Sequence, residues 1–311
     1  MNILITGGLG NLGSWLTRHF VGTEHQISVL AKNKRPILQE LDFEYIACDI
    51  SDINQVQSAL EDKSFDVVIH AASVNDGFKE NYFHDALIIN TLGTRNLLEY
   101  FKDKKLSNFI YLSTFQVYGV YSGTISEETP TNPVNDYGNT HLFSEYYIKQ
   151  LGKTHQLPFT IIRLTNSYGC PTDYNSSKWY LILNDLSKTA LETKEIVMRS
   201  NGKPSRDFIW MGDVCQLFQL IAESPAENEI YNISGEQTYS MLDVANEVHA
   251  AYKEVYGEDI TIKINEEDTK EYPQDLVVLS QKIRKRYNFV NKESHFKQEI
   301  KNIFTFLESK V

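Results

Sequence analysis

Tyr137 and His141 stand four residues apart in a stretch with helical character, so a helix would place both side chains on one face, one turn apart. A tyrosine that exchanges a proton near neutral pH starts from a reference pKa of about 10 and needs a neighbouring cation or hydrogen-bond donor to ease its ionisation. His141 offers such a donor. Two surface residues of a helix show the same spacing, so the meaning of the pair depends on the elements that position it.

The chain opens on a glycine-rich turn between a predicted strand and a predicted helix. Residues 2–6 are apolar and β-prone, glycines follow at Gly7, Gly10 and Gly13, and residues 14–21 have helical spacing. Glycines in this context let the backbone approach a pyrophosphate, while the free amides of the helix N-terminus point at it. An ordinary turn is the alternative for a single motif of this kind.

An alternation of strands and helices follows this turn and predicts the fold class. It favours an α/β protein with a doubly wound parallel sheet of the Rossmann type and a smaller C-terminal substrate-binding lobe. We expect residues 1–166 to form the dinucleotide-binding domain, with 207–235 returning to it, and residues 167–206 and 236–311 to form the lobe. The predicted strands are 26–30, 44–47, 67–70 and 109–112, and the predicted helices include 53–60, 86–101, 177–191, 240–251 and 294–307.

Composition excludes several classes of partner. A net charge of −11 over 311 residues argues against nucleic acid or an anionic membrane, because phosphate-rich surfaces require clustered Lys and Arg. The first residues do not resemble a signal peptide, and no apolar run approaches the roughly 20 residues of a membrane helix, so we expect a cytoplasmic protein. The three cysteines lack metal-type spacing, which favours reduced structural thiols and no metal site.

The end of the second predicted strand should choose between the two nicotinamide dinucleotides. A carboxylate there binds the adenosine ribose hydroxyls, whereas cations accept a 2′-phosphate. No acid is present, and Lys32, Lys34 and Arg35 follow the strand, so the sequence leans toward NADP, although a solvated basic loop has the same composition. Asp49 and Ile50, after the third strand, are placed to meet an adenine edge, with a helix-capping role as the alternative for Asp49.

Several motifs, taken in order, resemble those of the extended short-chain dehydrogenase/reductases, and within them the nucleotide-sugar epimerases, dehydratases and reductases. The likeness runs from residue 1 to about residue 240. The motifs are Thr6-Gly7-Gly8-Leu9-Gly10-Asn11-Leu12-Gly13, Cys48-Asp49-Ile50, His70-Ala71-Ala72-Ser73, Asn90 with Gly93-Thr94, Leu112-Ser113-Thr114-Phe115-Gln116-Val117-Tyr118-Gly119 and Tyr137-Gly138-Asn139-Thr140-His141.

The resemblance implies a nicotinamide-dependent enzyme that oxidises, reduces or epimerises a carbinol carbon of a nucleotide-linked sugar, of the 4-epimerase, 4-dehydrogenase or 4-ketoreductase type. Tyr137 would exchange the hydroxyl proton during hydride transfer, and Thr114 would hydrogen-bond the reacting hydroxyl. It also suggests a homodimer formed through the helices around Ala86 and Asn139. The implied catalytic residues are Thr114, Tyr137 and His141; the cofactor-binding residues are Gly7, Gly10, Asn11, Leu12, Gly13, Lys32, Asp49, Ile50, Ala71, Ala72, Asn90, Tyr137 and His141; the substrate-binding residues are Ser113, Thr114, Asn166 and Arg206.

Arg206 lies in Arg206-Asp207-Phe208, which resembles a family strand whose guanidinium contacts the substrate pyrophosphate. The alternative for Arg206 is an ion pair with Asp207 or Asp213. Arg163, in the strand before Asn166, is interpreted as structural.

Two departures from the family pattern limit these expectations. The family places a lysine one helical turn after the tyrosine, and this chain has His141, whose reference pKa of about 6.5 leaves it largely neutral at pH 7. Sugar 4,6-dehydratases carry an aspartate and a glutamate after the catalytic threonine, where this chain has Phe115 and Gln116, which cannot exchange a proton. Dehydration is therefore disfavoured. The alternative to an enzyme is a dinucleotide-binding sensor or scaffold protein with weak or no turnover.

Overall fold

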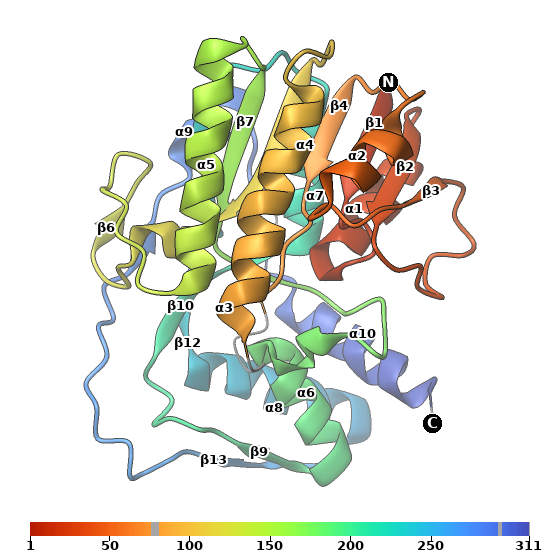
Figure 1. The fold of residues 1–311 in the computed structure, drawn as a ribbon. Helices are drawn as coiled ribbons and strands as arrows, with labels where there is room; N and C mark the ends of the chain where they lie inside the picture. Colours follow the sequence, from red (N-terminus) through yellow and green to blue (C-terminus); the bar gives the residue numbers. More distant parts are fainter. Residues whose placement is uncertain (76–80, 292–293, 311) are drawn as a thin grey trace.

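The computed structural model describes residues 1–75, 81–291 and 294–310. A seven-stranded sheet, parallel throughout, organises the upper part of the molecule in Figure 1, with strand order β3-β2-β1-β4-β5-β7-β11. The predicted doubly wound fold is confirmed. The strands are β1 (Asn2–Thr6), β2 (Gln26–Ala31), β3 (Glu44–Ala47), β4 (Val67–His70), β5 (Asn108–Thr114), β7 (Phe159–Leu164) and β11 (Glu229–Ile233).

Helices cover both faces of this sheet because alternate strand residues are apolar on both sides. In β1, Ile3 and Ile5 point into one core cluster and Leu4 points into the other. The first cluster is completed by α1 (Asn11–Val21), α7 (Met211–Ala222) and α9 (Gln281–Tyr287), and the second by α2 (Ile53–Leu60), α4 (Thr94–Phe101) and α5 (Asp136–Thr154).

The helix predicted over 86–101 is longer and less regular than expected. It begins with α3 (Tyr82–Asp85), continues through π-helical turns in η1 (Ala86–Gly93) and ends in α4. Gly93 lies in this irregular part, where a Cβ would come within 2.7 Å of the Ile50 side chain. The wider turns thus let the helix pass close to the end of the third strand.

A smaller lobe lies below the carboxyl ends of the strands (Figure 1). Its core contains the α10 stripe Phe296, Ile300, Ile303, Phe304 and Leu307, as its helical spacing predicts. The elements of the lobe are β8 (Asn166–Tyr168), η3 (Ser177–Tyr180), α6 (Ile182–Thr193), β9 (Glu195–Val197), β10 (Ser205–Trp210), β12 (Thr238–Ser240), α8 (Met241–Tyr256), β13 (Thr261–Lys263) and α10 (Phe296–Glu308). Three short elements lie beside the sheet: η2 (Phe115–Tyr118) and the paired strands β6 (Thr124–Ile125) and β14 (Val277–Val278).

Local signals in the sequence explain several boundaries. Ser240 and Asp243 form a capping box at the start of α8, as predicted. The three cysteines are free thiols, and Cys48 and Cys215 are buried. None of the helices among the described residues is long and apolar enough to cross a membrane. The described residues also contain no cluster of metal-ligating side chains.

Candidate active site

The glycine turn between β1 and α1 is built by close packing. Gly7 has a φ of +68°, and a Cβ there would lie 2.6 Å from the Ala72 Cα; a Cβ on Gly13 would lie 2.0 Å from the Gly7 carbonyl oxygen. Only glycine fits at these two positions. The turn therefore presses the N-terminus of α1 against the end of β1, where its amides are able to hold a dinucleotide pyrophosphate.

Asn11, the first residue of α1, carries a side-chain oxygen that is buried and has no hydrogen-bond partner within the described residues. A buried polar atom without a partner is costly unless a ligand or water satisfies it. This is consistent with Asn11 contacting a dinucleotide beside Gly10 and Leu12, as the sequence predicts.

The predicted adenine-side residues lie together after β2 and β3. Lys32 Nζ is 2.6 Å from Asp49 Oδ2, and Ser51 donates to Asp49 Oδ1 from both its amide and its hydroxyl. Burial alone would raise the pKa of Asp49, but the hydrogen bonds from Lys32 and Ser51 lower it below its ordinary value. The helix-capping alternative for Asp49 is wrong, because Asp52 caps α2 by accepting from the amide of Asn54.

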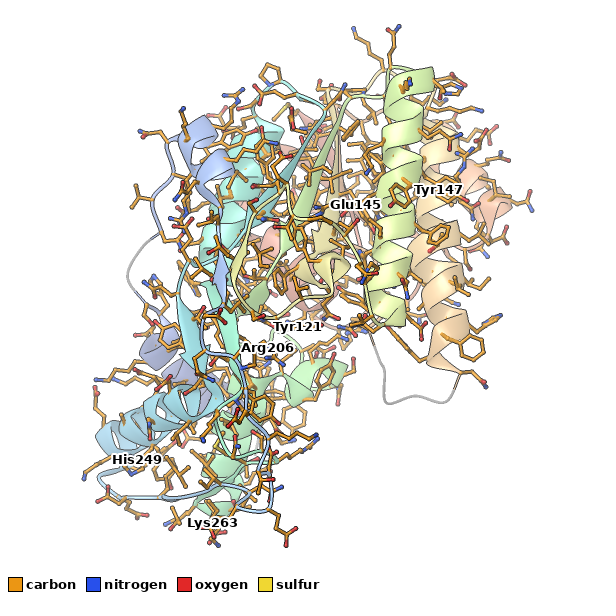
Figure 2. All side chains as sticks on the ribbon, turned by 90° about the vertical axis from the view of Figure 1, so that its left-hand side faces the viewer. Tyr121, Glu145, Tyr147, Arg206, His249 and Lys263 are labelled. Atoms are coloured by element: carbon orange, nitrogen blue, oxygen red, sulfur yellow. The ribbon has the colours of Figure 1, made fainter. Side chains whose placement is uncertain are left out.

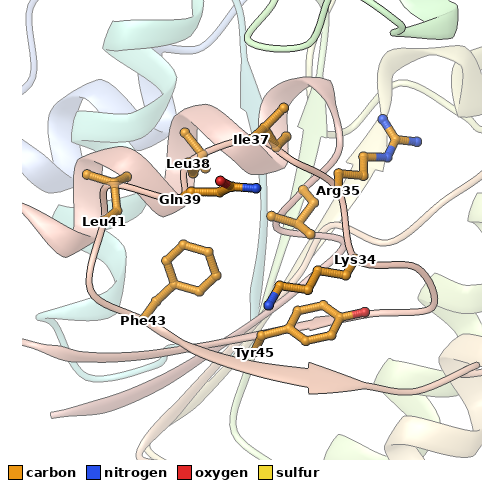
Figure 3. Close-up of a pocket in the computed structure, with 9 residues that line it drawn as sticks. Lys34, Arg35, Ile37, Leu38, Gln39, Leu41, Phe43 and Tyr45 are labelled. Atoms are coloured by element: carbon orange, nitrogen blue, oxygen red, sulfur yellow. The ribbon is translucent and has the colours of Figure 1, made fainter.

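A cavity of about 420 Å³ is lined by Leu9 of the glycine turn and by side chains between residues 34 and 45, most of which Figure 3 shows. Its polar groups are contributed mainly by Lys34, which lies 5.8 Å from the centre of the Tyr45 ring, and Arg35, which pairs with Asp173 of the lobe at 3.2 Å. The lining residues are Leu9, Lys34, Arg35, Ile37, Leu38, Gln39, Leu41, Phe43 and Tyr45.

Asn90 fixes the loop that follows β4. Its amide oxygen accepts from the Val74 amide at 2.7 Å, and its amide nitrogen donates to the Val74 carbonyl and to Thr140 Oγ1, both at 3.1 Å. The side chain is buried and fully occupied by these bonds. Asn90 therefore positions Ala71 and Ala72, the floor of the glycine turn, relative to the helix that carries Tyr137.

Tyr137 lies in the first turn of α5, and a small network fixes where that helix begins. Asn135 caps the helix by accepting from the Gly138 amide at 2.8 Å, and its own amide donates to Gln116 Oε1 at 2.8 Å. Gly138 lets the turn pack closely on η2, since a Cβ would meet the Gln116 carbonyl oxygen at 2.7 Å. The cap and the close contact place the Tyr137 ring at the carboxyl end of β5.

Tyr137 and His141 pack against each other, as the four-residue spacing predicts. Their ring centres are 4.4 Å apart in an edge-to-face arrangement. Burial raises the pKa of Tyr137 to about 12, although a hydrogen bond with Ser73 opposes this shift. The phenol is therefore protonated at neutral pH without a further charged neighbour.

His141 is held behind Tyr137 as a neutral side chain. It is only 1% exposed, and its Nδ1 lies 2.8 Å from the hydroxyl of Tyr111 on β5. Burial lowers the pKa of His141 to about 3, so it carries no charge at neutral pH. Its Nε2 is buried without a hydrogen-bond partner among the described residues. His141 therefore brings a dipole to the site, where an ammonium would bring a full charge.

Glu145, one turn beyond His141, forms a buried ion pair with Arg163 of β7. Arg163 donates from Nε to Glu145 Oε1 at 3.0 Å and from Nη2 to Oε2 at 2.7 Å. Ser113 donates to the same carboxylate at 2.7 Å. This contact turns the Ser113 hydroxyl toward the interior, away from the substrate-binding role predicted for it, and the structural interpretation of Arg163 fits the geometry.

Thr114, the last residue of β5, lies at the strand end that faces the lobe. Its side chain is 6% exposed and accepts from the Gln116 amide at 3.2 Å, which caps η2. Phe115 is buried in a cluster beside it. Neither Phe115 nor Gln116 presents an acidic group next to Thr114, and each has a packing or capping task of its own.

A second cavity, of about 390 Å³, lies where β8, β10, α6 and α8 of the lobe meet the first residue of α7. Both Asn166 and Arg206, which are predicted to bind the substrate, line it. Arg206 donates to the Ser205 carbonyl and has no ion pair among the described residues, while the Asp207 carboxylate accepts from Thr165, Gly235 and Gln237. The alternative ion pair of Arg206 with Asp207 is thus wrong. The other lining residues are Ser167, Tyr168, Gly169, Tyr180, Leu181, Ile182, Leu183, Asn184, Phe208, Met211 and Met241.

The chain is similar in sequence to a known protein family over most of its length. The sequence model of the NAD dependent epimerase/dehydratase family matches residues 3–234, about three quarters of the chain. The chain belongs to this family.

Individual members of the family show how far the likeness extends. A protein of Dictyostelium discoideum described as dTDP-D-glucose 4,6-dehydratase is 31% identical over 275 residues, which cover 79% of this chain but only 61% of that protein. A putative UDP-glucose 4-epimerase of Methanocaldococcus jannaschii is 29% identical over 245 residues, 76% of this chain and 78% of its own length. The crystal structure of UDP-glucuronic acid 4-epimerase from Bacillus cereus, in complex with UDP-glucuronic acid and NAD, matches with a TM-score of 0.83 at 24% identity over 100% of both chains, which shows a shared fold.

Although the chain belongs to the epimerase/dehydratase family, it differs from the expected family pattern at two places near Tyr137. His141 remains where the resemblance leads us to expect a lysine, and it is neutral and buried. The structure also adds Tyr111, Ser73 and Glu145 to the surroundings of Tyr137. Glu145 was detectable as the next residue on the His141 face of α5, whereas Tyr111 and Ser73 are brought to the site by the sheet alone.

Proposed function

We propose that this chain is an NAD(P)-dependent enzyme that oxidises, reduces or epimerises a carbinol carbon of a nucleotide-linked sugar, of the 4-epimerase, 4-dehydrogenase or 4-ketoreductase type. The observation that carries the proposal is that Tyr137 contacts Ser73, which follows Ala72 beside the glycine turn, and also lies near Tyr180, which lines the cavity of Asn166 and Arg206. Relatives described as epimerases and dehydratases of nucleotide sugars support it.

Separate groups of residues in this chain would hold the cofactor and move the proton. The turn at Gly7 and Gly13, with Asn11, would hold a nicotinamide dinucleotide, which supplies hydride acceptance and donation when bound. Thr114 would accept or donate a hydrogen bond at the sugar hydroxyl, and Tyr137 in its ionised phenolate form would take that proton, becoming the neutral phenol, as hydride leaves the same carbon for the dinucleotide. In reduction or re-addition the proton returns from Tyr137 to the carbonyl oxygen.

Dehydration of the sugar is not part of the proposal, although several relatives are described as dehydratases. Expulsion of a hydroxyl as water needs a proton donor beside the leaving oxygen. Phe115 is buried among apolar side chains and Gln116 donates and accepts only hydrogen bonds, so this chain lacks a group for that step at either position.

We propose NADP as the preferred dinucleotide, on the basis of the cations that follow β2. Lys34 and Arg35 line the cavity beside the glycine turn, and Lys32 projects from the end of the strand with most of its side chain exposed. NAD is the cofactor in the related Bacillus cereus structure, so the preference concerns this chain alone.

One experiment tests the function and the cofactor together. The purified protein is denatured, the released dinucleotide is identified by mass, and the native protein is then assayed at the nicotinamide absorbance band with UDP- and dTDP-linked sugars. Absorbance change, or interconversion of 4-epimers without net change, supports an enzyme. Tight dinucleotide binding without turnover of any sugar would favour the sensor or scaffold alternative, and failure to bind NAD or NADP would refute the proposal.

We expect substitution of His141 by lysine to move the pH dependence of sugar oxidation. Tyr137 accepts a proton only when ionised, so the rate rises with pH toward a pKa that burial has raised to about 12. An ammonium at residue 141 favours the phenolate and should shift the rising limb down by roughly 1 pH unit or more. The measurement is kcat/KM for oxidation from pH 6 to 10, with His141→Gln as an uncharged control that should not move the limb. An unchanged pH dependence of kcat/KM in His141→Lys would show that a charge at residue 141 does not favour the Tyr137 phenolate.

We also propose a homodimer, formed through the surface of η1 and α5. η1 packs beside α5 and continues from α3, and the three helices expose Phe83, Leu87, Leu92, Phe143 and Tyr146, each more than 40% exposed. Such a concentration of large apolar side chains is unusual for a free surface. Phe143→Asp should halve the mass measured by sedimentation velocity, whereas Val290→Asp, at a residue 78% exposed elsewhere, should not. A parent protein that sediments as a monomer would contradict the proposal.

A further inference from the structure

Arg206, which lines the same cavity as Asn166, contacts the ring of Tyr121. Arg206 comes from β10 in the lobe, and Tyr121 comes from the segment between η2 and β6, beside the sheet. The Arg206 guanidinium carbon lies 5.4 Å from the centre of the Tyr121 ring, and Figure 2 shows the two residues next to each other. The distance is within the range of a cation–π interaction.

This contact leaves the hydrogen-bonding edge of the guanidinium usable. A guanidinium carries five N–H donors, and Arg206 meets the π-face of the Tyr121 ring without a hydrogen bond to the Tyr121 hydroxyl among the described contacts. The Arg206 donor that is already used is Nη1, which donates to the Ser205 carbonyl at 2.8 Å. The remaining donors are available to two oxygens of a phosphate group in the cavity.

Tyr121 is itself held by a buried aromatic side chain. Its ring lies edge-to-face with Phe115 at a centre-to-centre distance of 6.2 Å, and Phe115 is 6% exposed. Phe115 packs in a cluster with Tyr118 and Leu142, so Tyr121 rests on a rigid base. Phe115, which stands where dehydratases have an acid, thereby supports the contact with Arg206.

We propose that Tyr121 is a positioning residue that holds the guanidinium of Arg206 ready for the diphosphate of the nucleotide sugar, and so favours nucleoside diphosphates over monophosphates. The inference rests on the proposed function, because it assumes a nucleotide-linked substrate in this cavity. An arginine that is already oriented loses less side-chain entropy on binding, and the ring strengthens the pair by keeping water from one face.

The test is a double-mutant cycle read by calorimetric titration with UDP, dTDP, UMP and dTMP. We expect Tyr121→Leu to weaken the two diphosphates by roughly three- to tenfold and the two monophosphates by less than about twofold. Tyr121→Phe keeps the ring and should bind like the parent. In an Arg206→Ala background, Tyr121→Leu should have no additional effect.

A matched control comes from the same chain. Arg286 lies 5.1 Å from the centre of the Tyr287 ring on α9, at the far end of the sheet from the lobe, so Tyr287→Leu removes a similar pair without touching the cavity. It should leave all four affinities unchanged.

The possible outcomes separate the two proposals. If the parent binds the diphosphates and Tyr121→Leu binds them equally well, the positioning role is overturned. Equal weakening of diphosphates and monophosphates would also overturn it, because Tyr121 would then contact the nucleoside. If the parent binds none of the four nucleotides, the proposed function fails, and this inference fails with it.

Discussion

Replacement of Tyr137 by phenylalanine should lower kcat by roughly 10²- to 10⁴-fold, the range typical for loss of a general acid or base. The ring and its edge-to-face contact with His141 are retained, so the first turn of α5 and the dinucleotide site should stay intact. The measurement is steady-state turnover of the nucleotide sugar that proves active, together with a fluorescence titration of the dinucleotide.

The control for Tyr137→Phe is Tyr146→Phe on the same helix. Tyr146 is 52% exposed and should be kinetically silent. Dinucleotide affinity within about twofold of the parent, with turnover lost, assigns the defect to proton transfer. A Tyr137→Phe protein as active as the parent would remove Tyr137 from the mechanism, even if the dinucleotide and the sugar bind as proposed.

The second large effect concerns stability, at Glu145. Replacement by alanine leaves the Arg163 guanidinium, which is 4% exposed, without its counter-ion, and removes the acceptor of the Ser113 hydroxyl. Breaking one partner of a buried pair typically costs about 3–5 kcal/mol. We therefore expect Glu145→Ala to lower the free energy of unfolding in urea by about this amount, or to prevent accumulation of soluble protein.

Two comparisons show whether burial of the charge is the cause. The double variant Glu145→Leu/Arg163→Met removes both charges and should recover much of the loss, because neither group is then left unpaired. Glu195→Ala breaks an exposed pair with Lys263 at 2.8 Å, at the outer end of the lobe in Figure 2, and should have little effect. Equal effects of Glu145→Ala and Glu195→Ala would contradict this explanation.

The sequence predicts the sheet and the glycine turn well because both depend on local features. Gly13 is required by a contact with Gly7 inside the same turn, and the φ of +68° at Gly7 favours glycine there before the added contact with Ala72 is considered, while alternate apolar residues define the strands. The contact of Tyr137 with His141 follows from helical spacing alone.

Other features of the site depend on contacts between distant residues, and the sequence does not show them. Tyr111 meets His141 because β5 lies beneath α5, and burial between these elements lowers the pKa of the histidine and keeps it neutral. Ser113 is expected in the site by position, yet its alternation along β5 turns it toward Glu145. The π-helical turns of η1 and the close approach of Gly93 to Ile50 are likewise not visible in the sequence of 86–101, which is compatible with a regular helix.

The path of the chain between the sheet and the lobe bears on how the protein is made. Edge strand β11 begins 65 residues after the end of its neighbour β7, and the lobe core receives α10 only at residues Phe296–Glu308. A nascent chain therefore exposes the apolar faces of α6 and α8 until α10 has been synthesised and packs against them. Neither part is a contiguous segment, so neither gains a complete core during translation before the other.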